Sequence, residues 1–300
     1  MCNVELYIIE CATNMHVGSG DASFTVVDNQ VERDVITNFP TINSSSLKGS
    51  LKSFLLNKEK HEEKNKGKVG DKVNLDKTYK IFGNDSGIGK YRIFPGMLLS
   101  YPIRSNIRPF FRAICPQIIC DLEKFLEGFG INLDKLNGMD KICELANKNK
   151  NSICIIEELN KDIKQVSNIK AEGYNAKVLK GNIDNDQVKN INELFGQNLV
   201  VMDDGTFSEI MNELPVIARN KLDNGESENL WYEEVVPRET RFYFGAVDSE
   251  KNYIDNDGEN DYEKLFHEIN FDNFKEYVQI GGNATIGYGY CRIRESNLER

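Results

Sequence analysis

The stretch FPTINSSSLKGSLKSFLL, residues 39–56, contains the sharpest local change of pattern in the chain. An extended segment, Phe39–Ile42, runs into Asn43 and three serines, and side chains of these types cap helix N-termini. Leucines then repeat every four residues, which is the spacing of one helix face. We therefore predict a helix over Leu47–Leu56.

The start of this helix is also a candidate phosphate site. Free N–H groups and the helix dipole attract anions to a helix N-terminus. A plain N-cap accounts for one serine, whereas Ser44, Ser45 and Ser46 supply three hydroxyls and Lys48 adds a positive charge. These four residues are therefore candidates for binding phosphate.

Other strands and helices surround this helix without strict alternation, which favours an α+β fold over a doubly wound sheet. An Asp-Asn-Gly turn at 223–225 predicts a hairpin between Val216–Arg219 and Leu230–Val236. The charged run Lys58–Lys80 predicts an exposed, mobile loop. The other predicted strands are Val4–Cys11, Met97–Ile103, Leu199–Met202, Thr240–Val247 and Tyr290–Ile293, and the other predicted helices are Arg108–Phe129, Asp186–Phe195, Phe207–Glu213 and Glu263–Tyr277.

Composition excludes several classes of protein. With 40% apolar and 28% charged residues, 300 residues suffice for a sizeable core, and fibrous, low-complexity and disordered chains are excluded. No run of eighteen apolar residues occurs, and the first residues lack the basic start of a signal peptide, so we expect a cytoplasmic protein away from membranes. Seven cysteines without a CxxC pair and three scattered histidines argue against a disulfide framework or a zinc site.

Charge is divided unevenly along the chain. Residues 1–120 hold 16 Lys and Arg against 12 Asp and Glu, whereas residues 121–300 hold 21 against 35. Within the first part, Gly87–Cys120 has five positive residues, no acid and interleaved aromatic rings. Such a segment suits single-stranded nucleic acid, or it is a half-buried segment whose arginines meet acids elsewhere, and composition does not choose between them.

A glycine loop near the end of the chain has a related ambiguity. Gly282 and Gly287 have the spacing of a phosphate loop, but Tyr288-Gly289 stands where Lys-Ser/Thr is required, which excludes a nucleotide-hydrolysing loop. The loop either brings backbone N–H groups to a polyanion or is a tight turn.

Taken in order, several segments resemble the RAMP superfamily, the repeat-associated RNA-binding family of CRISPR effector complexes. The resemblance begins with HVGSG (16–20), VDNQVERD (27–34) and the 39–52 segment. Later segments are similar to the multi-copy backbone subunits of type III-B (Cmr) effectors, and the match spans nearly the whole chain. These are FPGMLLSYPIRS (94–105), Cys115-Pro116, EVVPRET (234–240) and IGGNATIGYG (280–289).

The resemblance implies a ferredoxin-like, RRM-like core. It implies one RAMP domain over residues 1–300 with large insertions, and a protruding hairpin, the thumb, at 216–236, with Lys148–Asn198 as the other candidate segment. It further implies copies stacked in a helical filament on a guide RNA, together with other type III-B subunits. Such complexes cut complementary target RNA at regular intervals by metal-dependent endonucleolysis.

Site residues follow from the same resemblance. Asp28 matches the cutting residue and would hold a divalent metal, Mg or Mn, bound only with RNA. Glu234, with Glu233 beside it, would support cutting where the thumb of one copy meets a neighbour's Asp28. Guide RNA is expected on the HVGSG turn, the helix start, the basic segment and the glycine loop: His16, Ser44, Ser45, Ser46, Lys48, Lys52, Arg104, Arg108, Gly281 and Gly282.

The Asp28 loop departs from the family pattern, because Thr25-Val26-Val27 replaces a glycine segment and Gln30 replaces a proline. Three alternatives therefore stand beside the main hypothesis. The chain could be the homologous type III-A backbone subunit. It could be a guide-processing RAMP endonuclease, in which His16 rather than Asp28 would be essential. It could also be a non-catalytic guide-RNA-binding scaffold subunit.

Overall fold

The structure is a computed structural model that describes residues 4–20, 26–65, 76–163, 167–249, 276–296 and 298. The predicted helix Glu263–Tyr277 lies outside these ranges except for its last two residues, which are not helical.

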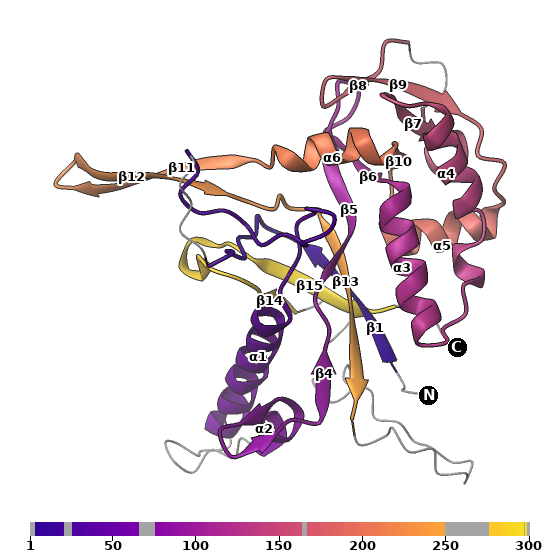
Figure 1. The fold of residues 1–300 in the computed structure, drawn as a ribbon. Coiled ribbons are helices and arrows are strands. Elements are labelled where there is room, and N and C mark those ends of the chain that lie inside the picture. The colour runs from indigo at the N-terminus through magenta and orange to yellow at the C-terminus, as the bar shows by residue number, and fades with distance from the viewer. Residues whose placement is uncertain are drawn as a thin grey trace, which may run out of the picture.

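One mixed sheet of eleven strands organises the fold (Figure 1). The first strand of the chain, β1 (Val4–Cys11), pairs antiparallel with β13 (Arg241–Asp248) and with β15 (Tyr290–Glu295). Most side chains of β1 are buried, as its β-branched and aromatic residues predict. The first strand and the two last long strands therefore lie side by side, and β14 (Val278–Gln279) closes this edge.

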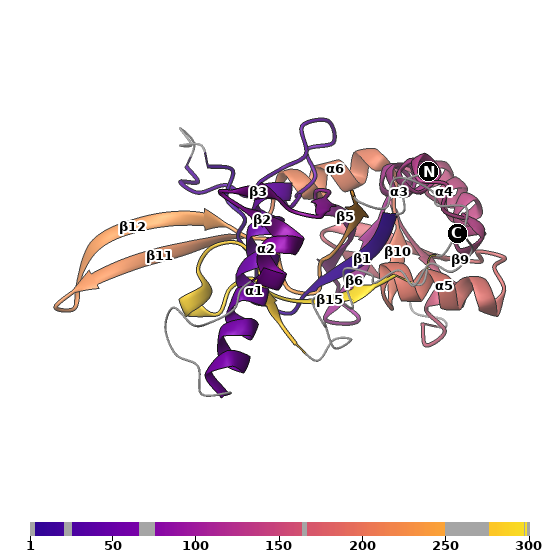
Figure 2. The ribbon, with the colours of Figure 1, turned by 90° about the horizontal axis from the view of Figure 1, so that it is seen from below.

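The other half of the sheet begins at β5 (Met97–Arg104), which pairs with β13. The order continues through β6, β10, β7, β9 and β8. Helices α3 and α4 lie on one side of this half and α5 on the other (Figure 2). These elements are β6 (Phe110–Ile114), β10 (Leu199–Val201), β7 (Ile153–Ile156), β9 (Tyr174–Leu179), β8 (Lys170–Ala171), α3 (Pro116–Gly128), α4 (Met139–Lys148) and α5 (Asn185–Phe195).

The predicted helix Arg108–Phe129 is wrong in its first half. Phe110–Ile114 forms β6, which pairs antiparallel with β5 and parallel with β10. The helix α3 begins only at Pro116, the position in a helix where proline is best tolerated. The apolar run before it is therefore a buried strand.

The predicted mobile loop Lys58–Lys80 is also wrong where the structure describes it. Helix α1 runs over Ser44–Asn65, nine residues past the predicted end, and α2 spans Asp76–Phe82. The buried hydroxyl of Thr78 donates to Oε2 of Glu59 at 2.5 Å, which fixes α2 against α1. Short strands β2 (Gly83–Asn84), β3 (Gly87–Ile88) and β4 (Tyr91–Ile93) follow, and β4 joins the sheet on β13.

The predicted hairpin is confirmed as an element and extends well away from the body (Figures 1 and 2). It consists of β11 (Val216–Asp223) and β12 (Glu226–Glu234). Asn224 and Gly225 both have positive φ, 50° and 91°, as a type I′ turn requires. Helix α6 (Asp204–Asn212), capped by Asp203, precedes it. The described residues also include three short 3₁₀ turns: Asp134–Leu136, Glu157–Leu159 and Ala284–Ile286.

The mixed α+β class is confirmed. None of the described helices is both long enough and apolar enough to cross a membrane.

Candidate functional site

Asp28 lies on an exposed loop that packs against the base of the hairpin. The backbone N–H of Tyr232 donates to Oδ2 of Asp28 at 2.8 Å, and the N–H of Asp28 donates to the Tyr232 carbonyl at 3.0 Å. No other described residue bonds the second carboxylate oxygen, Oδ1. The fold thus orients this side chain while leaving one oxygen accessible. The hairpin base, expected to meet a neighbour's Asp28, here meets the Asp28 of its own chain.

The buried side chain of Glu234 connects the hairpin base to the segment that follows Asp28. Its Oε1 accepts from Nη2 of Arg33 at 2.7 Å, and its Oε2 accepts from the N–H of Val31 at 3.1 Å. The side chains of Arg33 and Glu234 are 17% and 8% exposed. Glu234 therefore fixes the segment that follows Asp28, and both of its carboxylate oxygens are bonded within the fold.

Glu233 has an equally crowded environment. Its Oε2 accepts from Nε of Arg219 at 3.0 Å, and its Oε1 accepts from Nδ2 of Asn283 at 2.8 Å. The Arg219 guanidinium also lies 4.6 Å from the centre of the Tyr288 ring. Glu233 and Glu234 form a buried acid pair that joins the hairpin base to the Asp28 loop and to the glycine loop. The sequence motifs contain Arg33 and Asn283 but give no sign of these pairings.

His16 is part of the same assembly and is only 8% exposed. Its Nδ1 lies 2.7 Å from the Glu234 carbonyl and its Nε2 lies 3.9 Å from Oε1 of Glu233. The glycine loop packs against the backbone of His16, since the N–H of Gly282 donates to the His16 carbonyl at 2.8 Å. Gly281 has φ +85°, and a Cβ there would lie 2.3 Å from the same carbonyl oxygen. The requirement for glycine at 281 is therefore a matter of backbone packing.

The helix start is a capped N-terminus, with Asn43 rather than a serine in the capping role. Oδ1 of Asn43 accepts from the N–H of Ser45 at 3.1 Å and from its hydroxyl at 3.0 Å. Ser44 and Ser46 lie in the first turn, partly exposed, and Lys48 follows. The first turn keeps hydroxyl and ammonium donors near free N–H groups, as a phosphate site requires.

Most of the basic and aromatic segment Gly87–Cys120 fits the half-buried alternative, although Arg92 and Arg104 are exposed. Tyr91, Tyr101 and Phe111 are core residues. Arg104 pairs with Glu172 at 3.0 Å, and Arg108 pairs with Asp162 at 2.6 Å.

Lys90 and Arg112 of this segment also pair with acids, and Lys52 of α1 is bonded within the fold. The bond from Arg108 holds the pKa of Asp162 below its usual range. Arg112 pairs with Glu239, and burial together with neighbouring Arg241 lowers the pKa of the Arg112 guanidinium. Lys52, in α1, donates to the Gly83 carbonyl at 2.7 Å.

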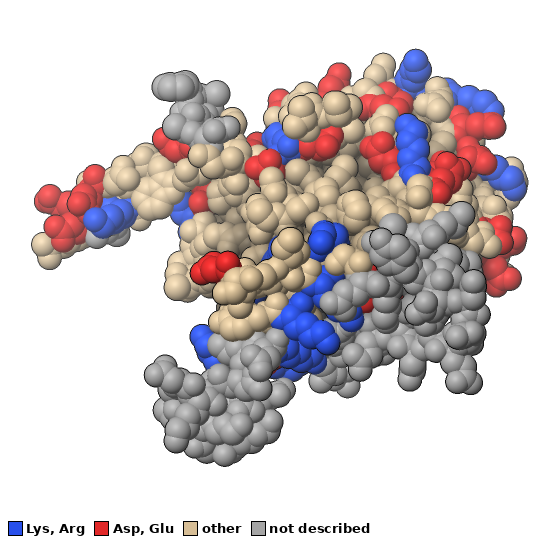
Figure 3. All heavy atoms as spheres, turned by 60° about the horizontal axis from the view of Figure 1, so that its bottom comes forward, with Lys and Arg blue, Asp and Glu red and all other residues tan. Residues whose placement is uncertain are grey.

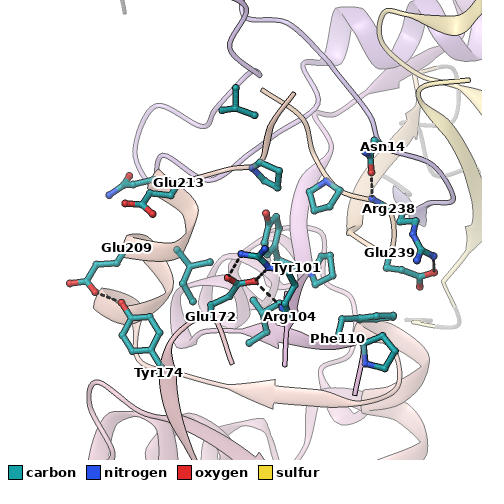
Figure 4. Close-up of a pocket in the computed structure, with 18 residues that line it drawn as sticks. Asn14, Tyr101, Arg104, Phe110, Glu172, Tyr174, Glu209, Glu213, Arg238 and Glu239 are labelled. Atoms are coloured by element: carbon teal, nitrogen blue, oxygen red, sulfur yellow. Dashed lines mark hydrogen bonds and ion pairs between the residues drawn. The ribbon is translucent and has the colours of Figure 1, made fainter. Parts of the chain in front are cut away.

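A pocket of about 870 Å³ opens beside the hairpin base but does not include Asp28 (Figure 4). Four of the seven prolines in the chain line it, which gives it rigid walls: Pro102, Pro109, Pro215 and Pro237. Two polar side chains at the edge of the pocket are already hydrogen-bonded within the fold. Arg104 donates to Glu172, and the Tyr174 hydroxyl donates to Glu209. That last bond raises the pKa of Tyr174 to about 12.

Among the described residues, no group of three or more His, Cys, Asp or Glu side chains is placed to hold a metal ion. A metal at Asp28 would therefore have one protein carboxylate as a ligand. Magnesium accepts such an arrangement when substrate phosphates and water complete its shell.

Comparison with known proteins gives a consistent picture. Residues 8–292 match the model of the RAMP superfamily. A Pyrococcus furiosus protein named CRISPR system Cmr endoribonuclease Cmr4 is 27% identical over 301 residues, covering 94% of this chain and 92% of that protein. A Saccharolobus solfataricus protein named CRISPR system CMR subunit Cmr4 is 23% identical, covering 98% and 97%.

Solved structures share the fold. A chain in the cryo-EM structure of the type III-B Cmr-beta complex bound to cognate target RNA superimposes with a TM-score of 0.71 at 23% identity, covering 98% of this chain and 97% of that one. A crystal structure of oligomeric Cmr4 from Pyrococcus furiosus matches with a TM-score of 0.66 at 22% identity, covering all of both chains.

Proposed function

The chain belongs to the RAMP superfamily, and from this premise we propose that it is the backbone subunit of a type III-B (Cmr) RNA-guided complex. It would bind guide RNA, stack with other copies of itself and with other subunits of the complex, and cut complementary target RNA in the cytoplasm. The full-length similarity to a protein named an endoribonuclease supports this function.

The observation that carries the catalytic part is the geometry of Asp28. Its loop is exposed, one carboxylate oxygen is fixed by the Tyr232 N–H, and the buried acid pair holds the loop from below. RNA cleavage by the adjacent 2′-OH needs a group that holds a metal or accepts the hydroxyl proton, with the strand positioned for in-line attack. Of the three acids at the hairpin base, Asp28, Glu233 and Glu234, Asp28 is the one that combines orientation with access.

Asp28 fits a divalent metal, Mg or Mn, that takes its remaining ligands from RNA. Such a metal would neutralise charge at the phosphate that is cut. The residues of the chain perform the other tasks. Tyr232 orients the Asp28 carboxylate, Glu234 and Arg33 fix the loop, and the first turn of α1 would hold guide phosphates beside it.

The finer features of the fold follow as proposals. We assign the 216–236 hairpin as the thumb, because it projects from the body and its base contacts the Asp28 loop. The strands around β1 would form the ferredoxin-like, RRM-like core of a single RAMP domain over 1–300, into which the remaining elements are inserted.

Cleavage by His16 is a weaker candidate. The imidazole is 8% exposed and Nδ1 already contacts a backbone carbonyl, so access to RNA is poor. The type III-A backbone subunit is less well supported, since both similar sequences carry Cmr names.

The test compares Asp28→Ala with His16→Ala in complex reconstituted with guide RNA. Loss of cutting in Asp28→Ala, with guide binding and assembly intact, is the expected result. Target cutting at the wild-type rate by Asp28→Ala would refute the catalytic assignment, and would favour a histidine mechanism if His16→Ala were inactive. A wild-type complex that binds target without cutting would show a scaffold.

A further inference from the structure

The surface formed by α1, α2 and β4 has a strong excess of positive charge that the proposed site leaves unused. Residues 44–93 of the sequence hold twelve Lys and Arg against six Asp and Glu. Of these, the structure describes the side chains of two acids, Glu59 and Asp85, and of eight cations: Lys48, Lys52, Lys58, Lys60, Lys77, Lys80, Lys90 and Arg92. Such an excess of positive charge attracts a polyanionic partner.

Some of these cations are already used inside the fold. Lys90 pairs with Asp248 at 3.2 Å, with both side chains buried, and Lys58 pairs with Glu276 at 2.8 Å. Lys52 donates to the Gly83 carbonyl. One nitrogen of Arg92, Nη1, also donates to a carbonyl, that of Gly89 at 2.9 Å, but the Arg92 side chain stays exposed. Of the two acids, Glu59 is occupied by the Thr78 hydroxyl and does not neutralise a lysine.

Lys60, Lys77, Lys80 and Arg92 are exposed and lie on regular elements of the fold. Lys77 and Lys80 are three residues apart on α2 and therefore share a face. The Lys80 carbonyl accepts from the N–H of Lys90 at 2.9 Å, which fixes the end of α2 against β4, where exposed Arg92 lies. No acid in the described part of the chain pairs with any of these three. Figure 3 shows basic side chains gathered on this face.

We propose that Lys77, Lys80 and Arg92 bind RNA backbone phosphates and extend the RNA path beyond the first turn of α1. This inference rests on the proposed function. Lys48 and Lys60 lie on the same helix twelve residues apart, about 18 Å at 1.5 Å per residue. That distance spans about five phosphates at 3.4 Å per strand of a duplex.

RNA is favoured over an acidic protein because the patch is continuous with the phosphate site at the start of α1. Protein interfaces also have an apolar centre, whereas Ile88 is the one large exposed apolar side chain among the described residues of α1, α2 and the 83–93 segment. Contacts of this type read charge and not base identity.

The test measures binding of a guide-length RNA across a salt series. The variant Lys77→Ala/Lys80→Ala/Arg92→Ala is compared with Lys150→Ala/Lys180→Ala/Lys189→Ala, which removes three exposed lysines from the opposite half of the sheet and changes net charge equally. Each phosphate contact on single-stranded RNA contributes about 0.7 to the slope of log K against log salt, so the patch variant should lose about 2. The control variant should keep the wild-type slope, and circular dichroism verifies folding of both.

Equal slopes for the patch and control variants would overturn the inference, because the wild type would still bind RNA through other residues. If the patch variant kept RNA binding but lost self-association at low salt, the surface would be a protein contact and the RNA assignment would be refuted. Failure of wild-type protein to bind RNA at all would refute the proposed function itself, which is a separate outcome.

Discussion

Substitution of Glu234 is the most informative single change, because it distinguishes structural support of the Asp28 loop from a direct part in RNA cleavage. Replacing it with alanine removes the 2.7 Å bond to Arg33 and the 3.1 Å bond to the Val31 N–H. It also leaves Arg33 largely buried without its acid.

Removal of one partner from a buried ion pair typically costs about 3–5 kcal/mol. Arg33 keeps two carbonyl acceptors, those of Asn38 and Met211, so the expected loss is at the lower end, about 3 kcal/mol. At about 2 °C per kcal/mol for a chain of this size, the Tm should fall by roughly 6 °C. Glu234→Gln keeps one acceptor oxygen, so it can retain the bond from Arg33 or the bond from the Val31 N–H but not both, and it should cost about 1–2 kcal/mol.

Chemical denaturation measures the free energy of unfolding, and a target-cleavage assay measures activity. Both are applied to wild type, Glu234→Ala, Glu234→Gln, Arg33→Met and the double variant Arg33→Met/Glu234→Ala. Coupling of roughly 2–3 kcal/mol between positions 33 and 234 is expected, and activity should follow stability, with Glu234→Gln mostly active. A stable Glu234→Ala protein, within about 1 kcal/mol of wild type, that no longer cuts RNA would refute the supporting role and give Glu234 a direct role in catalysis.

Further outcomes are expected at other positions. Lys48→Ala should weaken guide binding regardless of guide sequence and reduce the salt slope by about 0.7, whereas a changed sequence preference would mean that Lys48 reads a base. Gly281→Ala should lower the free energy of unfolding by about 2 kcal/mol or more, since φ is +85° and the new Cβ would meet the His16 carbonyl. Gly287→Ala is the matched control: φ is +84° but no atom lies within 4 Å of the new Cβ, so the loss should be smaller. Light scattering should find small species at high salt and open filaments at low salt or with RNA, because residues 1–120 and 121–300 carry net charges of +4 and −14 and a head-to-tail interface does not close. A closed dimer of fixed size under all conditions would count against that filament.

Local pattern was enough for several elements. β1, β5, β10, β13 and β15 were predictable because runs of β-branched and aromatic residues bounded by turn residues have few alternatives. The hairpin turn needed only Asn224-Gly225, where both residues accept positive φ. The exposed loop position of Asp28 was likewise readable from its polar neighbours and from the family resemblance.

Non-local contacts decided the rest. Phe110–Ile114 is a strand because β5 and β10 offer hydrogen bonds on both sides, and an apolar run of five residues does not by itself distinguish strand from helix. The charged end of α1 is helical where Thr78 of α2 contacts Glu59, a tertiary contact that outweighs the local pattern. The arginines of the basic segment could not be assigned to RNA or to acids from composition, because their partners Glu172, Asp162 and Glu239 lie 54 to 127 residues away along the chain.

The support of Asp28 is the clearest case of a feature that only the tertiary structure determines. Arg33 and Glu234 are 201 residues apart, and Asn283 lies 50 residues beyond Glu233. A carboxylate in the sequence shows no sign of whether it will face solvent or be buried against an arginine, because burial and pairing exist only once distant segments pack. The sequence could therefore indicate which loop carries the chemistry, but only the packing of the hairpin base, the glycine loop and the Asp28 loop distinguishes the accessible acid from the two acids that hold it in place.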